Sequence, residues 1–145
     1  MEFVVRDLEK GDFSKGFPGI LGQLTTVGEV SQEILLDRFE EINSSPDYKV
    51  IVIEDPKSNK IIATASLLIE RKFIRSCGKA GHIEDVVVDQ TYRGKHLGQR
   101  VIEALLVAAK EAGCYKVILD CAEANAAFYE KCGLTRKEVQ MVKYF

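Results

Sequence analysis

The sequence predicts a single α/β domain built on a mixed β-sheet, and three observations lead to this fold class. Two β-rich runs, 49–55 and 60–72, are joined by a short turn, which is typical of an antiparallel hairpin. The second half alternates strand and helix in the order β-α-β-α-β, which indicates helices packed on a sheet. The chain has 145 residues, 46% hydrophobic and 29% charged, as expected for one folded domain spanning 1–145.

The first half of the chain contains two strands of the hairpin and the elements before them. Residues 1–8 predict a strand, and residues 13–24 predict a short helix that Pro18 and several glycines disturb. Ser31 is a favourable N-cap, because its hydroxyl can accept a hydrogen bond from a backbone N–H of the first helical turn. The helix that follows extends to Asn43 and carries its apolar side chains on one side.

The second half predicts a central strand followed by a long helix. Val86, Val87 and Val88 put apolar side chains on both faces of a strand at 81–89, so this strand is expected inside the sheet and not at its edge. A loop at 90–95 leads to a helix at 96–112 with apolar residues at the helical period, ended by Gly113. The remaining elements are a buried strand at 115–121, a short helix at 125–132 and a final strand at 139–145.

Composition excludes several classes of protein. Twenty basic and 22 acidic residues give a formal net charge of -2, so no broad positive face for nucleic acid is expected. No apolar run approaches the about 18 residues of a membrane span. The first residues lack a signal-peptide pattern, which predicts a cytoplasmic protein. The four cysteines form no C-x-x-C pair and the chain has two histidines, so we expect reduced thiols and no metal site.

A loop rich in glycine and basic residues lies between the predicted central strand and the long helix. The backbone N–H groups and the positive end of the helix dipole at such a position favour phosphate. Arg93, Lys95 and Arg100 add positive charge, and Gly94 and Gly98 allow an anion to approach the backbone closely. The loop has neither a P-loop nor a Rossmann fingerprint. A solvated turn with no ligand is the alternative interpretation.

Three residues are candidates for proton transfer. Glu84 and Asp85 are neighbours on the predicted strand, so their side chains are expected on opposite faces. At least one of them lies among apolar residues, where loss of solvent makes a carboxylate a better proton acceptor. Tyr129 on the last helix could present its hydroxyl to a cleft, although aromatic residues commonly anchor short helices. His82 has no nucleophile elbow beside it, which argues against a hydrolase triad.

The order of these motifs resembles that of the GNAT superfamily of acetyl-CoA-dependent N-acetyltransferases: strand, Arg-x-x-x-x-Gly loop, helix, strand, Asn125 and Phe-Tyr-Glu-Lys-Cys-Gly at 128–133. Segments 81–88 and 113–121 narrow the resemblance to the glucosamine-6-phosphate N-acetyltransferases, and it extends almost end to end. The resemblance implies a mostly antiparallel central sheet flanked by helices, the GNAT acyl-CoA N-acyltransferase fold. It also implies an acyltransferase that moves acetyl from acetyl-CoA to the amine of D-glucosamine 6-phosphate in a ternary complex, a step of UDP-N-acetylglucosamine biosynthesis.

The same resemblance assigns residues to acetyl-CoA. It implies that the backbone of the predicted central strand pairs with the pantetheine arm, where an N–H can polarise the thioester carbonyl. It implies that the basic loop binds the pyrophosphate and that Tyr129 belongs to a second segment in contact with CoA. A phenol facing the thioester sulfur can protonate the leaving thiolate, which is the role we expect for Tyr129. The implied cofactor-binding residues are Val86, Val87, Val88, Arg93, Gly94, Lys95, His96, Leu97, Gly98, Gln99, Asn125, Tyr129, Glu130 and Lys131. One departure is His96, which stands where the superfamily loop often has its first glycine.

For the sugar phosphate, the resemblance implies that Glu84 and Asp85 orient the sugar and its amine, and with Tyr129 they are the implied catalytic residues. The family often supplies part of the substrate site across a dimer interface, so a homodimer with shared sites is implied. The predicted final strand is apolar enough to need cover, which fits a dimer, and Lys143 within it is a further candidate contact. The implied substrate-binding residues are Thr25, Lys72, Phe73, Ile74, Arg75, Glu84, Asp85, Val86, Tyr115, Lys116 and Asp120.

Two other functions stay open. The chain could be a GNAT enzyme that acetylates another amine, such as a protein lysine or a polyamine. The basic residues Arg71, Lys72 and Arg75 argue for a phosphorylated acceptor instead. The chain could also be a non-catalytic acetyl-CoA-binding module, although such a module has no need of a leaving-group acid such as Tyr129.

Overall fold

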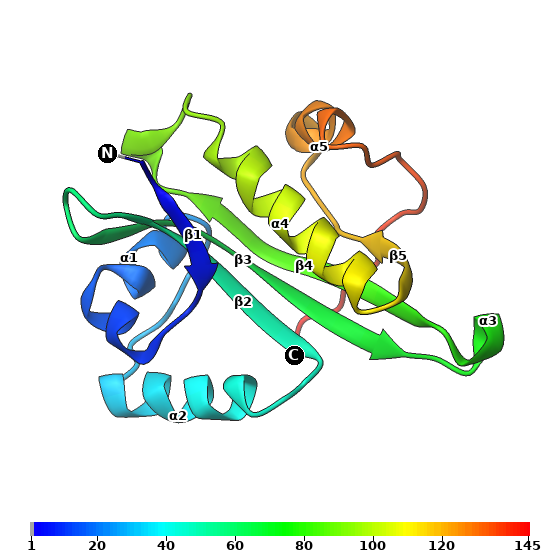
Figure 1. Cartoon of the computed structure of the whole chain (residues 1–145), viewed down its shortest axis with the longest axis horizontal. Coiled ribbons are helices and arrows are strands. Elements are labelled where there is room, and N and C mark those ends of the chain that lie inside the picture. The colour runs from blue at the N-terminus through cyan, green and yellow to red at the C-terminus, as the bar shows by residue number, and fades with distance from the viewer. Residues whose placement is uncertain (1) are drawn as a thin grey trace.

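The computed structural model describes residues 2–145 and contains a five-stranded sheet in the order β1-β2-β3-β4-β5 (Figure 1). All neighbouring strands pair antiparallel except β4 and β5, which run parallel. The predicted mixed, mostly antiparallel sheet is therefore confirmed, with β4 inside it. The strands are β1 (Val4–Asp7), β2 (Tyr48–Asp55), β3 (Lys60–Arg71), β4 (Lys79–Val88) and β5 (Cys114–Ile118).

The predicted hairpin is formed by β2 and β3. Its turn closes with a hydrogen bond of 2.8 Å from the Asn59 backbone N–H to the carbonyl oxygen of Asp55. Asn59 has a φ of 57°, a left-handed conformation that asparagine tolerates better than most residues. Both strands bury continuous apolar runs, because helices cover the two faces of the sheet at this point.

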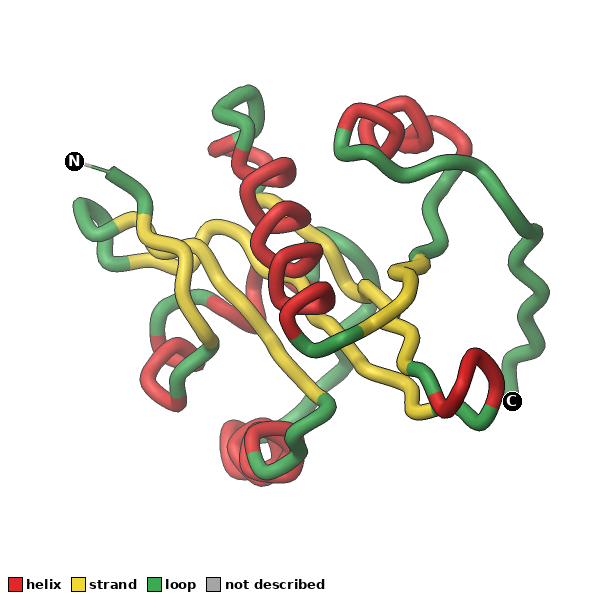
Figure 2. Tube along the Cα trace, turned by 45° about the vertical axis from the view of Figure 1, so that its right-hand side comes forward, coloured by secondary structure: helices red, strands yellow, loops and turns green. Residues whose placement is uncertain are grey.

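Helices lie on both faces of the sheet (Figure 2). The long helix α4 (Leu97–Glu111) packs on one face, where Val101 and Leu105 are fully buried against β3 and β4. The short helices η1 (Lys10–Ser14) and α1 (Phe17–Leu21) and the helix α2 (Gln32–Asn43) belong to the other face. The predicted N-cap is confirmed, since Ser31 Oγ accepts a hydrogen bond of 3.2 Å from the Ile34 backbone N–H.

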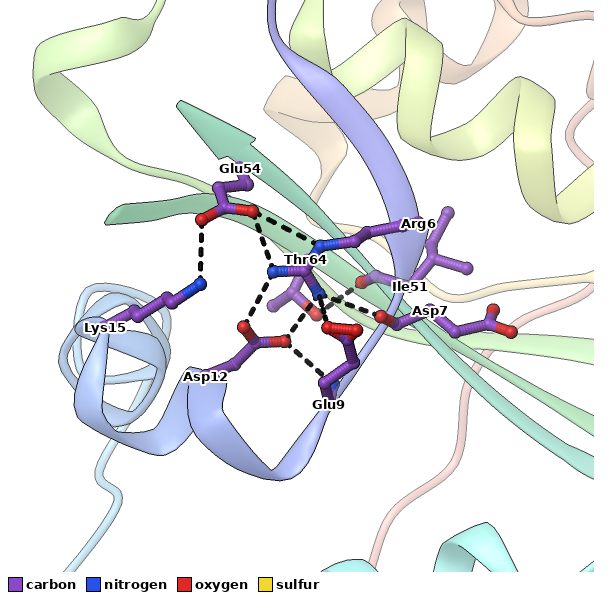
Figure 3. Close-up of polar contacts among 8 residues, drawn as sticks. All are labelled: Arg6, Asp7, Glu9, Asp12, Lys15, Ile51, Glu54 and Thr64. Atoms are coloured by element: carbon purple, nitrogen blue, oxygen red, sulfur yellow. Dashed lines mark hydrogen bonds and ion pairs between the residues drawn. The ribbon is translucent and has the colours of Figure 1, made fainter. Parts of the chain in front are cut away.

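A network of charged side chains ties β1 and β2 to η1 (Figure 3). The Arg6 guanidinium donates to both carboxylate oxygens of Asp12 at 2.8 Å and to Glu54 at 2.9 Å. Lys15 binds the other oxygen of Glu54 at 2.9 Å. Burial acts to raise the pKa of Asp12, but the hydrogen bonds from Arg6 and the Glu9 N–H outweigh it and hold that pKa below its usual value. The network fixes the N-terminal edge of the sheet to the first helices.

Four short elements complete the chain: α3 (Ile74–Cys77), η2 (Gln90–Tyr92), η3 (Glu123–Asn125) and α5 (Ala126–Lys131). The turn at α3 is absent from the sequence prediction. Its residues Arg75, Ser76 and Cys77 have φ values of 55° to 57°, so it is a left-handed turn. Such a turn has no apolar periodicity from which it could be predicted. In the described part of the chain, no helix is both long and apolar enough to cross a membrane.

The end of the chain differs from the prediction. Residues 134–145 contain neither helix nor strand, so the expected strand at 139–145 is not formed in the single chain, and Met141 and Tyr144 are exposed. A strand needs a neighbour to satisfy its backbone groups, and within residues 2–145 none pairs with this segment.

The strand expected to be buried at 115–121 is also corrected: β5 is a shorter edge strand with Tyr115, Lys116 and Ile118 exposed, because α4 covers only one of its faces.

Candidate active site

A cleft of about 460 Å³ opens where β4 and β5 diverge. The two strands are paired only from Lys79–His82 to Cys114–Ile118. Among the described residues, no strand pairs with that side of β4 beyond His82, so backbone N–H and C=O groups there are free to bind a ligand. Six of the predicted site residues line this cleft: Glu84, Asp85, Val86, Asp120, Asn125 and Tyr129.

The regular alternation that predicts Glu84 and Asp85 on opposite faces is interrupted at this point of β4. Asp85 has a φ of 53°, and the pairing of β3 with β4 shifts register between Thr64 and Ser66, across from it. This bulge breaks the alternation of side chains along the strand. Both residues border the same cleft, and Asp85 also borders a second hollow between α2 and the sheet.

Glu84 is the carboxylate whose protonation the site alters most clearly. Burial, with smaller contributions from the negative charges of Asp85 and Asp120, raises the pKa of Glu84 above its usual value. A carboxylate with a raised pKa is a stronger base once ionised. The side chain of Glu84 remains exposed, so the desolvation that was expected for at least one of the two adjacent carboxylates is partial.

Tyr129 is half-buried at the opposite wall of the cleft, in α5. Its ring packs edge-on against Phe128, with ring centroids 4.9 Å apart and an angle of 76° between the planes. Burial raises the pKa of the Tyr129 hydroxyl, so it is protonated at neutral pH and can donate a proton. Phe128 and Tyr129 both pack against the core beneath α4, and of the two only Tyr129 also lines the cleft.

The predicted anion loop leads into α4. His96, with a φ of 61°, precedes the helix, and no side chain caps the first N–H groups, at Leu97, Gly98 and Gln99. Gly94 has a φ of +85°, which a residue with a β-carbon rarely adopts. Arg93 and Lys95 are exposed and make no ion pair within the described residues. The loop thus offers backbone N–H groups and unpaired positive charge to an anion.

Two residues of the predicted basic cluster are paired with carboxylates, and the third lies over an aromatic ring. Arg71 binds Asp47 at 2.8 Å, and Lys72 binds Glu70 at 3.1 Å. Arg75 lies over the ring of Tyr115, with its guanidinium carbon 5.0 Å from the ring centroid. The Lys116 ammonium lies 5.7 Å from the same centroid. Two predicted substrate segments, 72–75 and 115–116, therefore meet beside α3, but none of their residues lines the cleft.

Other predicted residues lie around the cleft. Thr25 follows Leu24, which lines it, and the segment is tied to η2 by the hydrogen bond of 2.9 Å from the Gln90 N–H to Gln23 Oε1. Phe73 and Ile74 are exposed at α3. Glu130 and Lys131 are exposed on α5. Val87 is buried against α1 and Val88 is half-buried, so only their backbone is available to a ligand.

Several cleft residues were not predicted. Leu119, Cys121 and Ala122 follow β5, and Gln140 reaches back from the C-terminal segment to bind Asp120 at 3.1 Å. The sequence places Cys121 at the end of the predicted strand 115–121, which is the one signal for it, and nothing local signals Gln140. In residues 2–145, no group of three or more His, Cys, Asp and Glu side chains is placed to hold a metal ion.

A larger hollow of about 520 Å³ lies between α2 and the sheet, and it is not the candidate site. Its walls include Phe13, Phe17 and Phe39, and of the predicted site residues it contains Asp85 alone. It lacks the free strand edge and the tyrosine of the cleft. We therefore place the chemistry in the smaller cleft between β4 and β5.

Comparison with known proteins agrees with this geometry. Residues 7–134 match the acetyltransferase (GNAT) family. The chain is 56% identical over 144 residues to the glucosamine 6-phosphate N-acetyltransferase of Arabidopsis thaliana, covering 99% of this chain and 97% of that protein. It is 54% identical over 140 residues to glucosamine 6-phosphate N-acetyltransferase 1 of Dictyostelium discoideum, covering 96% and 88%. A crystal structure of the Arabidopsis thaliana enzyme superimposes with a TM-score of 0.98 at 55% identity, over 100% of this chain and 99% of that one. The chain belongs to the GNAT family of acetyltransferases.

Proposed function

We propose that this chain transfers the acetyl group of acetyl-CoA to the amine of D-glucosamine 6-phosphate, giving N-acetyl-D-glucosamine 6-phosphate and CoA. The observation that carries the proposal is the cleft between β4 and β5, which holds Glu84, Asp85 and Tyr129 beside an unpaired strand edge. The relatives at 54% and 56% identity, both named for this activity, support the choice of acceptor. The product would serve UDP-N-acetylglucosamine biosynthesis.

The reaction runs by direct attack within a ternary complex. The amine nitrogen bonds to the thioester carbon, and the oxyanion that forms is stabilised by a backbone N–H of β4. A carboxylate of the Glu84–Asp85 pair accepts the amine proton, directly or through water. When the carbon–sulfur bond breaks, Tyr129 gives its proton to the CoA thiolate. The raised pKa of Glu84 makes its ionised form a stronger base, and the raised pKa of Tyr129 keeps its hydroxyl protonated until the thiolate forms.

Acetyl-CoA would lie along the free edge of β4 with its pyrophosphate at the N-terminus of α4. The helix is 15 residues long, and its first N–H groups lack a side-chain cap. Arg93 and Lys95 supply charge beside them. Asn125, Glu130 and Lys131, on or next to α5, would border the CoA from the other side.

The sugar phosphate needs positive charge that the cleft of one chain lacks. Arg75 and Lys116 have no carboxylate partner in the described residues and both lie over the ring of Tyr115. Tyr115 is five residues before Asp120 of the cleft, about 16 Å along an extended chain. The two cations therefore do not line the cleft of their own chain. The same residues of a second copy could reach the cleft. We infer a homodimer in which each chain supplies Arg75 and Lys116 to the site of its partner.

The C-terminal segment supports the dimer. Val139, Met141, Val142, Tyr144 and Phe145 are exposed in the single chain, with Phe145 entirely so. A run of exposed apolar residues this long is costly in water and is typical of an interface. Pairing with a second copy would also supply the neighbour that the predicted strand at 139–145 lacks.

A CoA-release assay with a panel of amines tests the activity. We expect turnover with glucosamine 6-phosphate and at least tenfold less kcat/KM with glucosamine, because a charged hydrogen-bonding contact is lost. Equal turnover of the two sugars would refute the phosphate site. Preference for spermidine or a lysine peptide would point to a different acceptor, and CoA binding without release for any amine would indicate a binding module.

Subunit mixing tests the shared site. Arg75→Ala and Tyr129→Phe chains are expected to be weakly active alone. If Arg75 serves the partner's cleft, a dimer of the two variants contains one intact site. Random mixing should then recover about a quarter of the wild-type activity, because half the dimers are mixed. A monomeric mass by sedimentation at micromolar concentration, with full activity, would exclude the dimer.

A further inference from the structure

A hydrogen bond between Tyr92 and Asp55 joins the pyrophosphate loop to a distant hairpin. Asp55 is the last residue of β2 and is 8% exposed. Its Oδ2 accepts from the Tyr92 hydroxyl at 2.7 Å and from Ser58 Oγ at 3.1 Å. Its Oδ1 accepts from the Lys57 backbone N–H at 3.0 Å. The turn thus holds the Asp55 carboxylate in one orientation, as a fixed acceptor for Tyr92.

Tyr92 is the last residue of η2, directly before Arg93 at the start of the loop. Its backbone N–H donates to the Asp89 carbonyl at 2.9 Å, which closes η2. Its ring packs edge-on against Phe3, with centroids 5.9 Å apart. An apolar ring contact has little directional preference, whereas the hydrogen bond to Asp55 specifies where the Tyr92 hydroxyl lies. The hydrogen bond from Tyr92 also lowers the pKa of Asp55, so the acceptor is ionised at neutral pH.

The loop itself has few other restraints. Within the described residues, Arg93, Gly94 and Lys95 make no hydrogen bond, and all three are exposed. The next anchor is Leu97, which is 2% exposed at the start of α4. Tyr92 is therefore the fixed point from which Arg93 extends.

We propose that Tyr92 and Asp55 are positioning residues for acetyl-CoA: their hydrogen bond fixes η2 so that Arg93 and the following backbone N–H groups are held ready for the pyrophosphate. The inference rests on the proposed function only in taking a CoA pyrophosphate as the ligand of the loop. Neither residue lines the cleft, so neither touches the reacting atoms. Their loss should weaken CoA binding and leave the chemical step unchanged.

Tyr92→Phe is the direct test, because it keeps the ring and its contact with Phe3 and deletes the hydroxyl alone. We expect the Kd of CoA, measured by calorimetry, and the KM of acetyl-CoA to rise about tenfold, as for loss of a hydrogen bond to a charged group. The kcat and the KM of the sugar should stay within about twofold. Asp55→Ala should raise the Kd similarly, and the double variant should be no worse than the worse single one, because both remove one interaction.

The matched control is Tyr48→Phe, because Tyr48 is an exposed residue of β2 whose hydroxyl makes no hydrogen bond within the described residues. Its Kd for CoA should equal that of the wild type. If Tyr92→Phe lowers Tm but leaves the Kd unchanged, the bond is structural only and the inference fails. Calorimetry with CoA needs no acceptor amine, so an error in the proposed sugar does not affect this test. If the wild type binds no CoA, the proposed function and this inference both fail.

Discussion

Gly98, in the first turn of α4, lies against the aromatic ring of Phe128 in α5: a β-carbon at position 98 would be 3.0 Å from Phe128 Cζ. That distance is tighter than nine in ten real contacts of a β-carbon, so the ring would have to give by a few tenths of an ångström. The missing side chain therefore lets α5 dock on the helix that follows the anion loop. Since Tyr129 is next to Phe128 and packs on its ring, Gly98 fixes the proposed acid relative to the proposed pyrophosphate site.

Gly98→Ala should therefore displace α5 and impair catalysis. We expect kcat/KM for acetyl-CoA to fall about three- to tenfold, because the ring of Phe128 must give by a few tenths of an ångström and Tyr129 moves with it, whereas a full 1 Å misplacement would cost about a hundredfold. Gly11→Ala is the matched control, since a β-carbon there meets nothing within 4 Å. Steady-state kinetics of both variants decide the matter, and wild-type kinetics for Gly98→Ala would show that α5 is not positioned by this contact.

Tyr129→Phe should lower kcat about tenfold or more while the KM of acetyl-CoA stays nearly constant. The ring and its packing on Phe128 remain, but the proton donor for the thiolate is lost, and positioned general acids contribute about 10²–10⁴-fold. The interaction matters in the transition state, so kcat and kcat/KM should fall together. An unchanged kcat would remove Tyr129 from the mechanism and leave it as a core aromatic.

The pH profile should report Glu84. Activity requires the ionised carboxylate, so kcat falls as the pH drops through a pKa that lies above the usual glutamate value. Asp120→Asn removes a negative neighbour, lowers the pKa of Glu84 and should move this acidic limb to lower pH. His82→Gln removes a group that lowers the pKa and should move the limb the other way. Profiles of the three proteins, each normalised to its own maximum, provide the comparison; a limb that moves in neither variant belongs to the substrate amine.

Asp12→Asn should lower the free energy of unfolding without affecting the catalytic residues of the cleft. Asp12 is 1% exposed and accepts two hydrogen bonds from Arg6 and one from the Glu9 N–H, which one amide oxygen cannot replace. We expect a loss of about 3 kcal/mol in the free energy of unfolding, as for breaking a buried ion pair. Asp7→Asn, whose exposed side chain pairs with Lys49, should cost less than about 1 kcal/mol.

The pH dependence of that loss has a fixed sign. The pKa of Asp12 is lower in the folded state than the unfolded value of about 4. Its contribution is therefore fully present above about pH 4 and disappears as the pH falls through the folded pKa. The stability difference between wild type and Asp12→Asn, measured by urea denaturation, should shrink in acid. A difference independent of pH would mean that the charge of Asp12 is not its source.

Local patterns in the sequence predicted most of the fold. The apolar period at 96–112, the N-cap at Ser31 and the turn at 56–59 each determine backbone conformation within a few residues, and all three are confirmed in α4, α2 and the β2–β3 hairpin. The sequence also predicted the anion loop before α4. The assignment of Tyr129 to one site with Glu84 and Asp85 came from the resemblance to a known family. The left-handed turn at 75–77 was not, because no residue type there demands a positive φ.

By itself the sequence determined the order and kind of the elements, because side-chain periodicity and capping act over one or two turns of chain. Tertiary structure alone decided the site. The bulge at Asp85 interrupts the alternation of side chains along β4 where Glu84 and Asp85 border the cleft, since register depends on the partner strand and not on the strand itself. The divergence of β4 from β5 opened the edge for a ligand. The segment 139–145 remained without a strand, because a strand exists only where another chain segment accepts and donates its hydrogen bonds.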